Sequence, residues 1–375
     1  MNARRILPLT LFLIALFVAV WHWSVENDRA RVATARAHVE QPVLEKAPPL
    51  DPDEAVEREA ELAAAAGLPL EPAAVGDPHV PAVSEPVETG PRASFAVQVK
   101  DLVVPYSVMG LFVLPGEEVE FETVFERPEA EYSLLTESGT LLEASDGQWI
   151  WKAPEQPGYY PLFVEGPVDR IQFNVLVQEP FRNGPALFNG YRIGAYQSKP
   201  LRGDVRFNPP EGLIPVTEET AAVRVSPSFT LASFASHQPG NPRYMILDER
   251  LLIKLEMLLD ELQSDGFDVT TFTVMSAFRT PWYNASIGNT TRYSLHLYGR
   301  AADIFIDEDG DGRMDDLNGN GREDIGDARV LYDFIDRMKE QAWYQPFLGG
   351  MGLYGPKPHR GPFVHVDVRG YVARW

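Results

Sequence analysis

Two histidines and an aspartate in the second half of the chain have residue types that suit a hydrolytic metal site. His296 and Asp303 lie in the segment Ser294-Leu-His-Leu-Tyr-Gly-Arg-Ala-Ala-Asp, and His365 lies in Phe-Val-His-Val-Asp near the C-terminus. In such sites zinc takes three nitrogen or oxygen ligands from the protein and keeps one position open for water. The bound metal lowers the pKa of that water and polarises a carbonyl group.

The pattern Ser-x-His-x-x-Gly-x-Ala-x-Asp, followed by a histidine on a predicted strand, resembles the D-alanyl-D-alanine carboxypeptidase (VanY-like) family of zinc peptidases. That family belongs with the murein-cleaving LAS metallopeptidases, and the resemblance covers roughly the last half of the chain. It implies that His296, Asp303 and His365 are the zinc ligands. It also implies that Ser276 and Arg279 form a substrate-binding Ser-x-x-Arg element, whose arginine holds a substrate carboxylate or carbonyl.

One position departs from the pattern of that family. Classical members carry a Glu or Asp three residues before the last ligand as general base, and here that position is Pro362. Asp367 follows His365 by two residues, so on a strand both side chains point to the same face. Asp367 is therefore a candidate base, or alternatively a group that orients a metal ligand. His359 is a second candidate for proton transfer or for contact with the oxyanion.

An acidic insertion at 307–327 contains a nine-residue repeat, Asp-Glu-Asp-Gly-Asp-Gly-Arg-Met-Asp followed by Asp-Leu-Asn-Gly-Asn-Gly-Arg-Glu-Asp. Each unit fits the start of a calcium loop, with oxygen ligands at positions 1, 3, 5 and 9 and glycine at position 6. The repeat resembles tandem loops of thrombospondin type 3 or dockerin-like segments, and a solvated acidic loop is the alternative. The candidate ligands of this structural calcium are Asp307, Asp309, Asp311, Asp315, Asp316, Asn318, Asn320, Asp324 and Asp327.

Length and composition limit the functional classes. A chain of 375 residues is long enough for two or three domains. The net charge of −21 argues against a nucleic-acid-binding protein, which would show a basic face. Because the sequence has no cysteine, it forms no disulfide, and any zinc site must use histidine and carboxylate ligands.

Residues 1–23 have the pattern of a targeting segment. Two arginines precede an apolar run from Ile6 to Trp23, whose 18 residues are near the lower limit for a membrane span. We therefore expect an uncleaved N-terminal membrane anchor, with a cleavable signal peptide as the alternative. Residues 24–92 are rich in Pro, Ala and Glu and offer few large apolar side chains to bury. They are expected to form a flexible linker.

The pattern changes to a period of two between residues 93 and 180. Val119 and Phe121 alternate with glutamates, and Pro-Gly, Ser-Gly and Asp-Gly turns recur between short apolar runs. This spacing indicates a β-sandwich, and the stretch that begins Trp-Ile-Trp-Lys-Ala-Pro resembles Ig-like modules of exported proteins. We expect a spacer or docking module here, with an unknown partner.

Residues 181–375 mix helical and strand patterns. Asp248 is expected to cap a leucine-rich helix, and a second helix is expected from about 327 to 343. Asp303 and His365 both lie in predicted strands. The expected fold is therefore multidomain: an N-terminal transmembrane anchor, an all-β Ig-like sandwich, and an α+β zinc-peptidase domain with a small antiparallel sheet.

These features and the resemblance together predict an exported zinc metallopeptidase that hydrolyses peptide bonds in peptidoglycan stem peptides, as a D,D-carboxypeptidase or an endopeptidase. Arg279 would stabilise the developing oxyanion or bind a substrate carboxylate, and Ser294 would support the loop of His296. The expected location is the bacterial cell envelope, with the C-terminal domains in the periplasm and with peptidoglycan and the membrane as partners.

Two other functions stay open at this point. The first is a non-catalytic murein-binding module that retains the metal site, an interpretation favoured by Pro362. The second is a calcium-dependent adhesion or assembly protein of the cell envelope, in which the β-sandwich and the acidic loop bind the partner.

Overall fold

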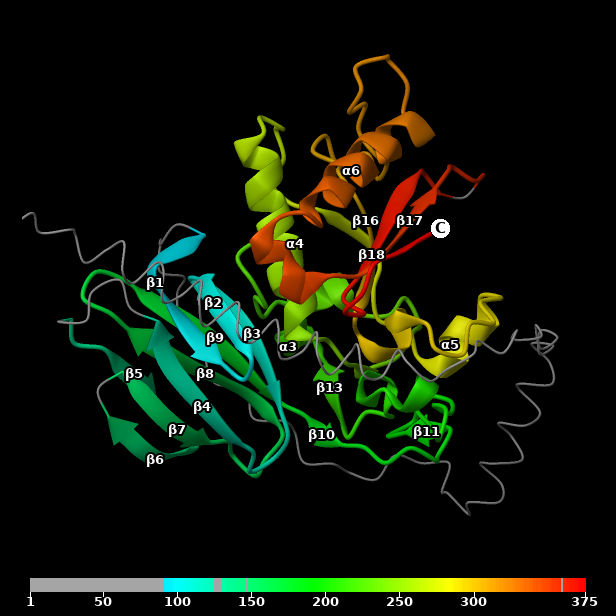
Figure 1. Cartoon of the computed structure of the whole chain (residues 1–375). Helices are drawn as coiled ribbons and strands as arrows, with labels where there is room; N and C mark the ends of the chain where they lie inside the picture. The colour runs from blue at the N-terminus through cyan, green and yellow to red at the C-terminus, as the bar shows by residue number, and fades with distance from the viewer. Residues whose placement is uncertain (1–90, 125–129, 146, 359) are drawn as a thin grey trace, which may run out of the picture. The chain divides into compact units, whose positions relative to one another are not determined.

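The computed structural model describes residues 91–124, 130–145, 147–358 and 360–375. All of these residues belong to one compact unit. Figure 1 shows that strands dominate the first part of the described chain. The two longest helices described, α4 (Glu249–Ser264) and α6 (Ile325–Met338), lie in the later part.

Two sheets form the first part of the described chain. In β4, Val119 and Phe121 are buried and the glutamates that alternate with them are exposed, because successive side chains of a strand point to opposite faces. The Phe121 ring meets that of Phe173 in the other sheet at 5.3 Å between centroids. One sheet has the order β2 (Leu102–Tyr106), β1 (Arg92–Val99), β4 (Glu118–Val124), β7 (Gln148–Lys152), β6 (Thr140–Ser145). The other has the order β3 (Val108–Val113), β9 (Arg170–Val177), β8 (Gly158–Glu165), β5 (Ser133–Thr136).

Three further sheets follow in the later part. The sheet that carries the candidate site has the order β15 (Thr273–Ser276), β16 (Ala301–Phe305), β18 (Phe363–Asp367), β17 (Gly350–Tyr354), β19 (Ala373–Arg374). Its pairs are antiparallel except β17 with β19, which is parallel. The smaller sheets contain β10 (Glu179–Pro180), β13 (Gly212–Val216) and β14 (Arg243–Met245), and β11 (Leu187–Phe188) with β12 (Tyr191–Arg192).

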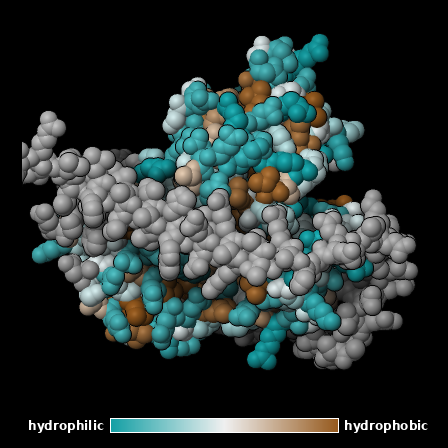
Figure 2. Space-filling view, in the orientation of Figure 1, coloured by the Kyte–Doolittle hydropathy of each residue, from teal (hydrophilic) through white to brown (hydrophobic). Residues whose placement is uncertain are grey.

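Short helices connect these strands. In the described part of the chain, the two short α-helices are α3 (Glu218–Ala221) and α5 (Pro281–Ser286). The 3-10 helices are η1 (Leu201–Gly203), η2 (Val205–Phe207), η3 (Leu231–Phe234), η4 (Leu295–Tyr298) and η5 (Ala342–Phe347). In the view of Figure 2 the surface over α6 is mainly hydrophilic, with small apolar patches. This agrees with the exposed charged residues Arg329, Asp333 and Arg337 along that helix.

The capping residues decide where the two long helices begin. The Asp248 carboxylate accepts a hydrogen bond from the Arg250 amide, so α4 begins as predicted. The second helix, predicted from about 327 to 343, runs from Ile325 to Met338. The Asp324 carboxylate accepts from the Gly326 amide, and the Asp327 carboxylate accepts from the Asp324 amide. This capping box makes Asp324 the N-cap and places Asp327 inside the first turn.

The fold class expected from the sequence is wrong and needs correction. The described chain is mostly β with few helices. No helix among the described residues is long and apolar enough to cross a membrane. The predicted anchor (1–23) and nearly all of the predicted linker (24–92) lie outside the described residues.

The register of the central strands places the candidate site. Asp303 on β16 is the partner of His365 on β18 and of Ser276 on β15. Three positions that are far apart in the sequence therefore lie side by side across three neighbouring strands. The loop after β15 carries Arg279, and η4 before β16 carries His296.

Candidate metal centre

The side chains of His296, Asp303 and His365 converge on one point. Asp303 Oδ1 lies 2.8 Å from His365 Nδ1 and 3.4 Å from His296 Nε2, and the two nitrogens are 3.2 Å apart. All three residues are buried, and their potential ligand atoms lie within 4.8 Å of one another. Two nitrogens and one oxygen this close form a donor set of the size that one metal ion needs.

The loop of His296 is held by close backbone packing. The 3-10 helix η4 ends at Gly299, whose φ of 62° lies in the left-handed region. A Cβ at Gly299 would lie 2.3 Å from the Ile246 carbonyl oxygen, so only glycine fits there. His296 Nδ1 lies 2.6 Å from the Ala277 carbonyl oxygen. Because a carbonyl only accepts, Nδ1 carries the hydrogen, and the Nε2 lone pair faces Asp303 and His365.

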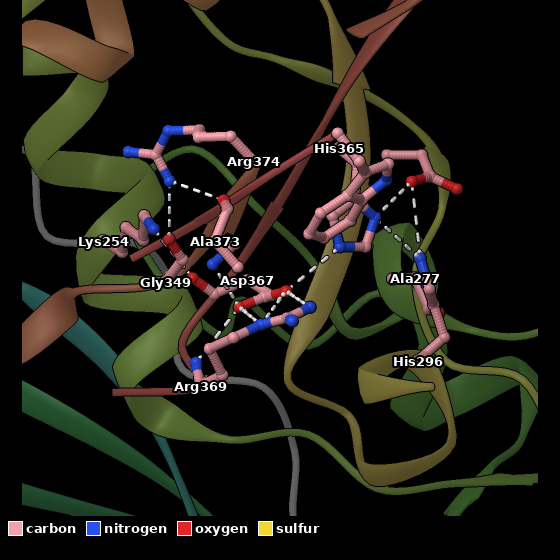
Figure 3. Close-up of polar contacts among 12 residues, drawn as sticks. Lys254, Ala277, His296, Gly349, His365, Asp367, Arg369, Ala373 and Arg374 are labelled. Atoms are coloured by element: carbon pink, nitrogen blue, oxygen red, sulfur yellow. Dashed lines mark hydrogen bonds and ion pairs between the residues drawn. The ribbon is translucent and has the colours of Figure 1, made fainter. Parts of the chain in front are cut away.

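His365 lies between two carboxylates. Figure 3 shows its ring between Asp367 on one side and His296 on the other. Its Nε2 lies 3.3 Å from Asp367 Oδ2, while its Nδ1 faces Asp303. Burial alone would lower the pKa of His365, but hydrogen bonds to Asp303 and Asp367 raise it above the ordinary value. Burial lowers the pKa of His296, whereas the imidazoles keep the pKa of Asp303 far below its usual range despite burial.

Asp367 lies beside His365 on β18 and is fully buried. Its two oxygens accept hydrogen bonds from Arg369, at 3.0 Å from Nε to each, and from the Gly350 amide at 2.7 Å. Asp367 does not line the cleft described next. Of its two interpretations, candidate base and orienting group, the geometry favours the second, because its lone pairs are engaged by Arg369, Gly350 and His365.

A cleft of about 540 Å³ opens at the candidate metal centre, where Asp303 lines it and His296 and His365 are not among its lining residues. Its lining includes two residues predicted from the sequence to bind substrate, Ser276 and Arg279, together with Asp303. Arg279 is nearly buried and reaches Asp303 Oδ2 at 3.3 Å through Nη2. Its Nε is buried and has no hydrogen-bond partner among the described residues. The guanidinium therefore has donor capacity left for a bound group.

The structure separates the remaining site predictions. Ser294 is the residue before η4, with no side-chain capping hydrogen bond, and it is not among the lining residues. His359 lies outside the described residues. The lining also includes four residues that the sequence motif does not contain: His237, Tyr283, Lys357 and Arg360. They come from the loop before β14, from α5 and from the loop before β18, and no common spacing links them to the motif.

The acidic insertion folds as two similar loops. In the first, the Gly312 amide donates to Asp307 Oδ2 at 3.1 Å, and in the second the Gly321 amide donates to Asp316 Oδ2 at 2.5 Å. Both glycines have positive φ. The sixth residue of each unit therefore contacts the first, as the repeat predicts.

Only some of the predicted calcium ligands of the insertion lie close together. The carboxylates of Asp307, Asp309 and Asp315 lie within 4.8 Å of one another. Burial and neighbouring acids raise the pKa of Asp315. In the second loop, Asn318 Nδ2 donates to Asp327 Oδ1 at 2.7 Å, and Asp324 caps α6. The side chain of Asp311 accepts from the Arg313 amide and is not part of the first cluster.

Comparison with known proteins gives no family. No family model matches the chain, and a search of curated proteins found no match.

Proposed function

We propose that the protein is an exported zinc metallopeptidase that hydrolyses peptide bonds in peptidoglycan stem peptides in the bacterial cell envelope. The observation that carries this proposal is the convergence of His296, Asp303 and His365 beside a cleft that also presents Arg279. The peptidoglycan substrate rests on the resemblance of Ser294–Asp303 to the VanY-like peptidases. D,D-carboxypeptidase and endopeptidase activities both fit the proposal.

The three side chains fit zinc. Zinc in catalytic sites is held by nitrogen and oxygen ligands, each oriented by an outer partner. His296 has such a partner in the Ala277 carbonyl, and His365 has one in Asp367. When bound there, zinc would polarise the scissile carbonyl and lower the pKa of a water molecule.

The cleft itself supplies contacts for the substrate. Arg279 can hold the carbonyl oxygen on which negative charge develops, because its guanidinium lines the cleft next to Asp303. Lys357 and Arg360 also line the cleft, and Asp303 is the one carboxylate among the described lining residues. Such a lining suits a substrate with an anionic group, such as the free carboxylate of a stem peptide.

The test is hydrolysis of purified muropeptides by the whole chain, first without metal and then with added zinc. We expect release of amino acid or peptide with zinc and none without it. His296→Ala should remove the activity at every zinc concentration, since it deletes one of three ligands. Hydrolysis that is equally fast without metal, or in His296→Ala, would contradict the proposal.

A non-catalytic murein-binding module is the second candidate. It is favoured by Pro362 at the usual position of the base and by the engagement of Asp367 with Arg369. The same experiment separates the two candidates if binding to sacculi is measured in parallel. Binding without product release, in zinc-loaded protein, would favour the module.

We also propose that the insertion at 307–327 binds structural calcium. Its support is the repeated contact between the sixth and first residues of each unit and the close approach of Asp307, Asp309 and Asp315. A divalent cation would remove the repulsion among these carboxylates. It would stabilise the fold and take no part in the reaction.

A further inference from the structure

The cleft contains few groups that can accept a proton. Among the described lining residues, the acidic and imidazole side chains are Asp303 and His237. The other charged lining groups, Arg279, Lys357 and Arg360, are cations that only donate. A hydrolytic reaction needs an acceptor for the proton of the attacking water. Among the described lining residues the candidates are these two, and His359 lies outside the described residues.

Both carboxylate oxygens of Asp303 already have partners. Its Oδ1 contacts both imidazoles of the metal centre, at 2.8 Å and 3.4 Å, and its Oδ2 contacts Arg279 at 3.3 Å. A carboxylate that serves as a metal ligand and is paired with an arginine is a poor proton acceptor, because protonation would break these contacts. Asp367, the other acid near the centre, does not line the cleft.

His237 lines the cleft, and a hydrogen bond holds one of its ring nitrogens. Its Nε2 lies 2.7 Å from the Met275 carbonyl oxygen. A carbonyl only accepts, so in the neutral ring Nε2 carries the hydrogen and Nδ1 keeps its lone pair. Met275 lies on β15, directly before Ser276, whose register partner is Asp303. The imidazole is thus anchored to the strand next to the one that carries a metal ligand.

The neighbours of His237 hold its backbone in place. Ser236 and Gln238 are buried, whereas His237 itself is exposed. The Gln238 side chain accepts from Thr280 at 2.7 Å and donates to the Arg192 carbonyl at 2.9 Å. The two buried neighbours therefore fix the backbone at His237, and the Met275 carbonyl fixes its exposed imidazole. Burial of the loop does not require a histidine at this position.

We infer that His237 is the general base of the proposed hydrolysis, in the role that the VanY-like pattern gives to an acid at the position of Pro362; the inference rests on the proposed function. His237 Nδ1 takes a proton from water as the water oxygen bonds to the scissile carbonyl carbon. The imidazolium returns this proton to the amide nitrogen as the carbon–nitrogen bond breaks. The products are an amine and a carboxylic acid, which loses its remaining proton to solvent.

The experiment compares His237→Gln with the wild-type chain, both loaded with zinc, on a purified muropeptide. A glutamine amide still donates to the Met275 carbonyl but has no basic nitrogen. We expect kcat/KM to fall at least about 100-fold, with unchanged zinc content and melting temperature. His79→Gln, the same change in the segment before the described residues, is the matched control and should leave kcat/KM unchanged.

A second variant keeps the test decisive if glutamine disturbs the loop. His237→Ala should lose activity to the same extent and regain part of it on addition of imidazole, which restores the missing base. If the activity of His237→Gln is within twofold of wild type, the inference about His237 is overturned and the proposed function is not. Loss of zinc from the variant would also overturn it, because His237 would then act on the metal centre. A wild-type chain that hydrolyses nothing would overturn the proposed function and the inference together.

Discussion

Each imidazole of the candidate metal centre has one nitrogen engaged by an outer acceptor and the other turned toward Asp303. For His296 the acceptor is the Ala277 carbonyl, and for His365 it is the Asp367 carboxylate. Such partners fix the tautomer and the orientation of the ring before a metal binds. The metal affinity of the site should therefore depend on residues that never touch the metal.

Asp367→Asn tests this dependence. The asparagine keeps the size of the side chain but leaves the Arg369 guanidinium without its carboxylate and weakens the contact to His365. We expect zinc affinity to fall about 10- to 100-fold, measured by competition with a chelator of known affinity. Asp333→Asn, at an exposed position of α6, is the control. If Asp367→Asn binds zinc as tightly as wild type and loses only hydrolysis, Asp367 is the base after all.

Zinc binding should weaken as the pH falls. The carboxylates of Asp303 and Asp367 raise the pKa of His365 above its ordinary value. Below that raised pKa, zinc must displace a proton from the metal-free centre. Below that pKa, the apparent affinity should fall about tenfold per pH unit for one displaced proton. Above it, the affinity should level off. Titrations with zinc between pH 5 and 8 measure the slope, and a flat profile would show that His365 is not a ligand.

At the scale of elements, helix caps could be predicted from neighbouring residues, whereas the pairing of strands could not be predicted. The cap at Asp248 depends only on neighbouring residues, so it could be predicted. The start of α6 could be placed only approximately because Asp324 and Asp327 both suit a cap, and their mutual hydrogen bonds decide between them. Asp303 and His365 are 62 residues apart. Their adjacency depends on the register of β16 with β18, which no local pattern specifies.

The same limit applies to the cleft. His237 reaches it through a contact with β15, and Lys357 through a loop before β18. Both positions follow from tertiary packing of segments that have no common period. The motif around His296 could therefore predict three side chains that the structure brings together, and the Ser-x-x-Arg element could predict Ser276 and Arg279 of the cleft lining. His237 and Lys357 could not be predicted from spacing.

Lys254 on α4 gives a prediction on stability. It is fully buried, donates to the Asp367 carbonyl at 2.8 Å, and burial lowers its pKa from 10.5 to about 7. Between these two pH values the unfolded chain binds the proton and the folded chain does not. The free energy of unfolding should therefore rise with pH from about 7 toward 10.5, by up to about 1.4 kcal/mol per pH unit.

Lys254→Met should remove most of this slope. The variant loses the buried ammonium group, so it should be more stable than wild type near pH 7, and the difference should shrink as the pH rises. Urea unfolding at several pH values between 7 and 10 measures both slopes. Parallel slopes in the two proteins would mean that Lys254 keeps an ordinary pKa in the folded state.

The acidic insertion should couple calcium to α6. Asp327 belongs to the capping box of α6 and also contacts Asn318 of the second loop. Calcium that binds only the folded state would raise the free energy of unfolding by about 2.7 kcal/mol at a hundredfold excess over Kd. Melting curves at fixed zinc, with millimolar calcium or with a calcium-selective chelator, measure this gain. The double variant Asp309→Ala, Asn318→Ala should abolish this gain. If calcium does not change the melting curve of the wild-type chain, the insertion is a solvated acidic loop.

At the scale of the whole molecule, most buried apolar side chains of the described chain belong to one hydrophobic cluster, and a second, smaller cluster includes Phe181, Tyr191 and Tyr244. Phe173 and Val175 of β9 belong to the same buried cluster as Leu255 of α4 and Val364 of β18. The Asn174 side chain donates to the Arg224 carbonyl at 2.7 Å. The domain boundary predicted near residue 180 stays a prediction, because a change of pattern does not show whether the two sides bury a common surface.

The charge of the cleft contrasts with that of the chain. The net charge is −21, yet the described cleft lining has three cations and one carboxylate. We expect a stem peptide with a free C-terminal carboxylate to bind better than its amide, and Arg360→Gln to reduce that preference several-fold through KM. Steady-state kinetics with the two peptides measures it. Equal KM values of the wild-type chain for the two peptides would mean that these cations do not contact the carboxylate.

We infer that His296, Asp303 and His365 together hold one zinc ion. The most direct test is titration of zinc into the metal-free chain, with X-ray absorption at the zinc edge to identify the ligand atoms. We predict about one tightly bound zinc per chain, with a shell of nitrogen and oxygen only, and loss of most of that zinc in His296→Ala and in His365→Ala. If both variants bind zinc as tightly as the wild-type chain, the assignment of the metal centre is wrong.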